Sequence, residues 1–66
     1  MTIAAGLDVG SRIAKAVLID ENRRVLGKGL ARTKPDFARV AREALEAALT
    51  QANVNEADVN YIASTG

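Results

Sequence analysis

The stretch 3-IAAGLDVGSRIAKAVLID-20 decides the fold, because it holds two apolar segments separated by a short polar turn. Residues 3–9 lack a clean alternation of apolar and polar side chains, which is typical of a strand covered on both faces. Residues 14–20 predict a second strand, centred on Val17, Leu18 and Ile19. The chain therefore begins with two strands joined by a turn.

Residues 25–32 predict a third strand, and the polar turn at 20–23 makes strands two and three an expected antiparallel hairpin. One face of the third strand carries Val25, Gly27, Gly29 and Ala31. The two glycines either weaken this strand or let another element pack closely against it. Gly27-Lys28-Gly29 has no third glycine and no helix directly after it, so it is not a dinucleotide-binding fingerprint.

An amphipathic helix is the clearest element after the hairpin. Its apolar stripe, with spacings of three and four, consists of Phe37, Val40, Ala41, Ala44, Leu45, Ala48 and Leu49. Thr33 or Asp36 can cap its start, and Pro35 suits its first turn, where an N–H would have no partner. Asn53 suits the left-handed residue that ends many helices.

A fourth strand is expected at residues 59–63, after a capping box formed by Asn55 and Asp58. The order is β-β-β-α-β, and a helix crossing between two strands implies that they are parallel. We therefore expect an α/β sheet with an antiparallel hairpin at one edge. The helix would cover one face, and nothing in these residues would cover the other. Residues 1–66 are thus expected to be the incomplete N-terminal part of a single domain, or a half that needs another chain.

The composition excludes several kinds of function. There is no cysteine and no histidine, which excludes disulfides, thiol nucleophiles, histidine bases and metal sites built from either residue. Nine basic and eight acidic residues give a net charge of +1, without the basic stripe of a nucleic-acid-binding surface. There is no apolar run of ~20 residues and no basic leader. We expect a cytoplasmic protein that binds neither nucleic acid nor membrane.

Residues 8–11 (DVGS) are the candidate chemical site. Gly10 would let the backbone approach phosphate oxygens, and the N–H groups of residues 10–12 can form a small anion-binding concavity. The Ser11 hydroxyl can add a hydrogen bond. Asp8 would repel phosphate but can hold Mg²⁺, most naturally through the water shell of the ion. The alternative is that Asp-x-Gly-Ser is ordinary turn chemistry.

Two further observations bear on what kind of phosphate site this would be. Lys15 follows the turn and can place a point charge near a phosphate oxygen. No G-x-x-x-x-G-K-[ST] motif occurs, so the chain is not a P-loop protein.

The motif 6-GLDVGS-11, followed by Lys15 and an apolar strand, resembles the first phosphate motif of the actin, sugar-kinase and heat-shock-chaperone ATPase superfamily. Within it, the chain is most similar to the BadF/BadG/BcrA/BcrD ATPase family. Its start 1-MTI-3, the helix, the phrase 57-ADVNYIA-63 and the closing 65-TG-66 fit that family in order, so the resemblance covers all 66 residues.

The resemblance implies a fold of two ribonuclease-H-like domains that hold ATP and Mg²⁺ in the cleft between them. This chain would be the ribonuclease-H-like β-β-β-α-β portion of such an actin-like ATPase domain, in truncated form. By motif position, Asp8 would be the acid associated with Mg²⁺. The nucleotide-binding positions would be Gly10, Ser11, Arg12, Lys15, Thr65 and Gly66, and no residue of this chain is assigned a catalytic role.

The same resemblance implies a function. Members of the family are ATPase subunits of benzoyl-CoA reductases and activators of 2-hydroxyacyl-CoA dehydratases, in which ATP hydrolysis helps to push a low-potential electron to the partner enzyme. Two such subunits share a [4Fe-4S] cluster held by cysteines, which implies a homo- or heterodimer. These 66 residues lack those cysteines, the second phosphate motif and the adenosine pocket. We therefore expect no ATP hydrolysis from them alone.

Two alternatives remain open from the sequence. A sugar or acetate-type kinase would share the same ATPase fold. A non-catalytic interaction module would offer a strand edge or a helix face to a partner, with Asp8 in a plain turn.

Overall fold

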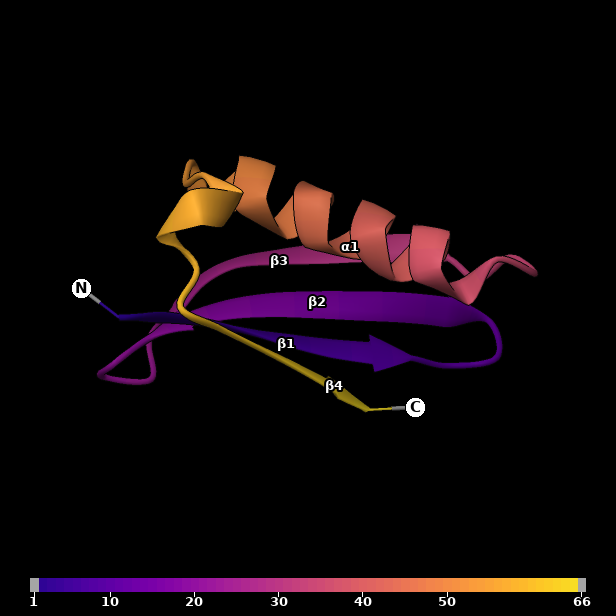
Figure 1. Ribbon diagram of the computed structural model, residues 1–66, viewed down its shortest axis with the longest axis horizontal. Coiled ribbons are helices and arrows are strands. Elements are labelled where there is room, and N and C mark those ends of the chain that lie inside the picture. Colours follow the sequence, from indigo (N-terminus) through magenta and orange to yellow (C-terminus); the bar gives the residue numbers. More distant parts are fainter. Residues whose placement is uncertain (1, 66) are drawn as a thin grey trace.

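The computed structural model describes residues 2–65, with residue 65 described by its backbone alone. The strands are β1 (Ile3–Val9), β2 (Ile13–Asp20), β3 (Val25–Arg32) and β4 (Tyr61–Thr65), in the order β3-β2-β1-β4. The helix α1 (Phe37–Ala52) and the short 3-10 helix η1 (Glu56–Asp58) connect β3 to β4. Figure 1 shows α1 lying along one side of the sheet. The predicted α/β fold and its β-β-β-α-β order are confirmed.

The first three strands form an antiparallel meander, and β4 pairs with β1 in parallel. β2 begins at Ile13, one residue earlier than predicted, because Ile13 already pairs with Arg32 of β3. The Asp20 carboxylate closes the turn between β2 and β3 by accepting hydrogen bonds from the N–H groups of Asn22 (2.8 Å) and Arg24 (2.9 Å). The predicted hairpin is therefore held by its own turn chemistry.

α1 begins at Phe37 because the Asp36 side chain caps it, accepting a hydrogen bond from the Arg39 N–H at 3.2 Å. Pro35, expected in the first turn, instead precedes the cap and lies outside the helix. Asn53 ends the helix in the predicted left-handed conformation, with φ 58°. The predicted apolar stripe of the helix is wrong at its first residue, since Phe37 is 59% exposed. Phe37 stands beside a hollow that no described residue fills.

The core lies between α1 and the sheet. Its buried side chains are Ile3, Ala5, Ala14, Ala16, Leu18, Val40, Ala44, Leu45, Ala48 and Leu49. Two glycines of β3 let the helix backbone come close: a Cβ at Gly27 would lie 2.6 Å from the Ala48 carbonyl oxygen, and one at Gly29 would overlap the Ala44 carbonyl. Of the two interpretations of these glycines, close packing is the one that the structure confirms.

β4 is Tyr61–Thr65, two residues later than the predicted 59–63. The reason is that Asn60 is occupied in anchoring the chain to the start of β1. Its side-chain oxygen accepts the Ile3 N–H at 2.9 Å, and its own N–H donates to the Ile3 carbonyl at 2.8 Å. The regular parallel ladder therefore begins at the residue after Asn60, where Tyr61 lies opposite Ala4.

η1 is held by a capping box at its start and by a side-chain contact with α1. The predicted capping box is present, and the Asp58 carboxylate accepts the Asn55 N–H at 3.0 Å. Arg42 of α1 donates from both terminal nitrogens to the two carboxylate oxygens of Glu56, with Nη1 to Oε2 at 2.8 Å, and its Nε donates to Glu46 at 3.2 Å. This bidentate contact joins η1 to the helix surface.

The sheet face opposite α1 is left open by the described residues. Alternation along the strands places Ile13, Leu30 and Tyr61 there, and these side chains are 48%, 65% and 66% exposed. The expectation that these residues do not cover this face is therefore confirmed for residues 2–65. Among these residues, no helix combines the length and apolarity needed to cross a bilayer.

Candidate phosphate-binding site

The turn between β1 and β2 is tight at Gly10. The Gly10 N–H donates to the Ile13 carbonyl at 3.1 Å, and a Cβ on Gly10 would lie only 3.2 Å from the same oxygen. This contact favours a residue without a side chain. It also means that the Gly10 N–H is used inside the turn, so the row of donors expected from the sequence begins at Ser11.

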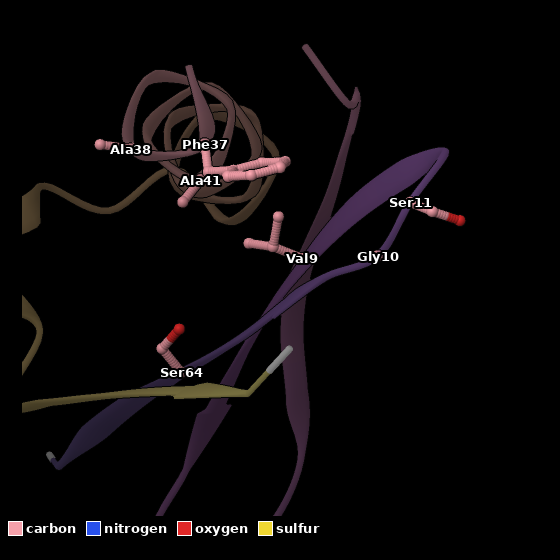
Figure 2. A pocket seen from close by; sticks show the side chains of 7 residues that line it. All are labelled: Val9, Gly10, Ser11, Phe37, Ala38, Ala41 and Ser64. Carbon is pink, nitrogen blue, oxygen red and sulfur yellow. The ribbon is translucent and has the colours of Figure 1, made fainter. Parts of the chain in front are cut away.

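Ser11 is exposed and has no hydrogen-bond or ion-pair partner within residues 2–65. In Figure 2 its hydroxyl points away from α1. Arg12 follows it, also exposed, and its backbone carbonyl accepts a hydrogen bond from the Thr33 N–H at 2.9 Å. The turn therefore offers a hydroxyl and backbone donors to solvent at the end of the sheet.

Asp8 and Lys15 lie directly opposite each other in the β1–β2 ladder, on the open face of the sheet. Both side chains are exposed, and no described residue, Lys15 included, makes a hydrogen bond or ion pair with the Asp8 carboxylate. On the other side of Asp8, Thr65 is its register partner in β4. A hollow of about 350 Å³ lies over this part of the sheet, lined by Gly6, Leu7, Asp8, Lys15, Ala16, Val17 and Ala63.

A second hollow, of about 460 Å³, lies on the α1 side of the same turn (Figure 2). It is lined by Val9, Gly10, Ser11, Phe37, Ala38, Ala41 and Ser64. Val9 and Ser64 point toward the helix in this view. The predicted site residues are thus divided between two faces. Asp8 and Lys15 line the hollow on the open face, whereas Gly10 and Ser11 line the hollow on the α1 side.

The remaining predicted positions are Thr65 and Gly66. The backbone of Thr65 pairs with Asp8, so the end of β4 comes beside the end of β1. Gly66 lies outside the described residues.

Thr33 lies at the turn, although the sequence predicted it only as a candidate helix cap. Its Oγ1 donates to the Gly10 carbonyl at 2.8 Å, in addition to the bond from its N–H to Arg12. The signal that points to it is the register of the meander. Because Arg32 pairs with Ile13, the next residue along the chain must lie beside the turn.

The donor set fits a loosely held divalent cation better than a dedicated metal cage. In the described part of the chain, no three His, Cys, Asp or Glu residues gather in one place. Asp8 is a single exposed carboxylate beside the turn, which suits Mg²⁺ because this ion keeps several waters and takes few protein ligands when phosphates supply the rest.

No family model matches the chain, and no curated protein matches it in sequence. Its fold is similar to that of component A of (R)-2-hydroxyglutaryl-CoA dehydratase from Acidaminococcus fermentans, with a TM-score of 0.86 and 20% identity over the whole chain. It is also similar to a diol dehydratase-reactivating factor in its nucleotide-free form, with a TM-score of 0.85 and 23% identity over 98% of the chain.

These likenesses show that the four-stranded sheet and its helix have the fold of part of each of these two proteins. The chain spans 25% of the length of the dehydratase component and 12% of the length of the reactivating factor.

Proposed function

We propose that this chain forms one wall of an Mg·ATP site in an ATPase that activates a partner enzyme. The observation that carries the proposal is the position of Asp8 and Lys15, which face each other on the open side of the sheet next to the Gly10–Arg12 turn. A carboxylate suited to Mg²⁺, a cation suited to phosphate and a turn with backbone donors thus meet at one end of the sheet.

Each residue has a distinct role in this proposal. The N–H groups of Ser11 and Arg12 and the Ser11 hydroxyl hold phosphate oxygens, and Lys15 adds a positive charge. Asp8 orients Mg²⁺ through the water shell of the ion. When bound, Mg²⁺ neutralises the phosphates and so favours transfer of the terminal phosphoryl group to water. The end of β4 at Thr65 closes the site on the side of β1 away from Lys15.

The facing wall of the site must come from elsewhere, either from further sequence or from another subunit. Phosphoryl transfer requires the transferred group to be positioned from both sides, and these residues provide one side. The ligands of the [4Fe-4S] cluster found in the resembled family would likewise have to come from elsewhere. The chain has no cysteine, so its residues do not fit such a cluster.

The partner in this proposal is a dehydratase or a reductase acting on a CoA ester. Support comes from the identities of the two structural neighbours, a dehydratase component and a dehydratase-reactivating factor, and from the motif resemblance to the BadF/BadG/BcrA/BcrD family. In this role, the ATPase uses hydrolysis to drive a conformational change that assists electron transfer to the partner enzyme, acting as a dimer.

Titration of the intact protein with Mg·ATP, together with its ATPase rate, tests the proposal. Asp8→Ala should lower both the affinity and the rate by tenfold or more. Glu21→Gln is the matched control, because it removes a carboxylate charge at the opposite end of the sheet, and it should behave like the wild type. If Asp8→Ala leaves both quantities unchanged, Asp8 sits in a plain turn and the phosphate site is wrong.

A further inference from the structure

Thr33 is bonded to the residues on both sides of Ser11. Its Oγ1 donates to the Gly10 carbonyl at 2.8 Å, and its N–H donates to the Arg12 carbonyl at 2.9 Å. Together with the bond from the Gly10 N–H to the Ile13 carbonyl at 3.1 Å, these contacts fix three backbone groups of the short turn. The turn is therefore held from outside its own hairpin by a residue 23 positions along the chain from Gly10.

The bond from the Thr33 hydroxyl has a consequence for the Ser11 N–H. The Gly10 carbonyl and the Ser11 N–H belong to the same planar trans peptide group, so they point in opposite directions. Because the Gly10 carbonyl is drawn toward Thr33, the Ser11 N–H is turned away from it and toward the solvent side of the turn. Ser11 has no hydrogen-bond partner of its own within residues 2–65. No contact of Ser11 in the described structure therefore sets the direction of its N–H.

We infer that Thr33 is a positioning residue, whose hydroxyl orients the Ser11 N–H as a donor to a nucleotide phosphate. The inference rests on the proposed function and extends it to a residue outside the β1–β2 motif. Thr33 touches the turn and not the phosphate, so it acts through the peptide group between Gly10 and Ser11.

This role differs from a contribution to folding. Gly10 is exposed, so water can replace the Thr33 hydroxyl at its carbonyl when that hydroxyl is removed. The loss of one exposed hydrogen bond then costs little global stability, whereas the peptide group is no longer held in one orientation. Nucleotide affinity should therefore respond more strongly than the melting temperature.

The test uses Thr33→Val, Thr33→Ser and the control Thr50→Val in the intact protein. The valine variants remove a hydroxyl while keeping a β-branched shape, and Thr50 is an exposed residue of α1 outside the turn. We expect Thr33→Val to weaken Mg·ATP binding about three- to tenfold, the range for one lost hydrogen bond, and to raise KM with little change in kcat. Thr33→Ser should stay within about twofold of the wild type because it restores the hydroxyl.

Amide hydrogen exchange gives a readout that needs no nucleotide. The Gly10 N–H donates to the Ile13 carbonyl within the turn that the Thr33 hydroxyl helps to hold. This amide should therefore exchange several-fold faster in Thr33→Val than in the wild type or in Thr50→Val. Unchanged exchange, or wild-type affinity in Thr33→Val, overturns the role of Thr33 alone. A wild-type protein that binds no Mg·ATP overturns the proposed function and the phosphate role of Thr33 with it.

Discussion

Asp8 and Lys15 are direct cross-strand partners in the antiparallel pair of β1 and β2, on the sheet face that α1 leaves open. Side chains at such positions have Cβ atoms about 4.5–5.5 Å apart, so a carboxylate and an ammonium can act on the same bound group. The arrangement balances their charges. Asp8 alone would repel a phosphate, whereas the cation beside it attracts one.

Lys15→Gln should weaken Mg·ATP binding about tenfold, since it removes a charge next to the phosphate turn. The matched control is Lys28→Gln. Lys28 is an exposed cation on the same face but on β3, where it pairs with Val17, farther from the turn. Isothermal titration should show less than about twofold change for the control. Equal losses in both variants would mean that the general charge of the face, and not Lys15, attracts the nucleotide.

Gly29→Ala should lower the free energy of unfolding by about 1–3 kcal/mol, the usual cost of overpacking. The added methyl group would overlap the Ala44 carbonyl of α1, and a backbone atom cannot turn aside as a flexible side chain can. Gly6→Ala is the control, because a Cβ there would lie 3.7 Å from the nearest atom, Val17 Cγ1, which is an ordinary contact. Denaturant unfolding of both variants checks this, and equal stability would contradict the close packing of α1 on β3.

Leu18→Ala should lower the free energy of unfolding by about 2–5 kcal/mol. Leu18 is fully buried in the core between the sheet and α1. Its cross-strand partners Ala5 and Gly27 are small and leave few atoms to fill the cavity. Leu30→Ala makes the same chemical change at a side chain that is 65% exposed and should cost less than about 1 kcal/mol. If Leu30→Ala costs as much as Leu18→Ala, the open face is covered in the protein as it was tested.

The strands and the helix could be predicted from local patterns because those patterns act within a few residues. The spacing of apolar residues in α1 and the left-handed stop at Asn53 are examples. The start of β4 could not be predicted in this way. It depends on Asn60 docking against Ile3, a contact across 57 positions that leaves no periodic trace in the sequence.

The candidate site was predictable only in part for the same reason. Asp8, Gly10 and Ser11 are neighbours in the sequence, and their residue types indicate phosphate chemistry. That Lys15 shares a face with Asp8 follows from the register of a hairpin, which depends on the length of its turn. Thr33 was assigned only to a helix cap, because its link to Gly10 spans 23 positions and passes through the end of a third strand.

Glu56→Gln should lower the denaturation midpoint at pH 7, and the difference from the wild type should shrink as the pH is lowered into the acid range. The hydrogen bond from Arg42 holds the pKa of Glu56 below its ordinary value. A carboxyl whose pKa is lower in the folded state stabilises that state above its unfolded pKa, and this stabilisation is lost as the pH falls below about 4.3. Glu46→Gln, which leaves the bidentate contact between Arg42 and Glu56 in place, should have the smaller effect at pH 7. Urea titrations at pH 7 and pH 3 measure the difference, and a difference of the same size at both values would show that the charge of Glu56 is not its cause.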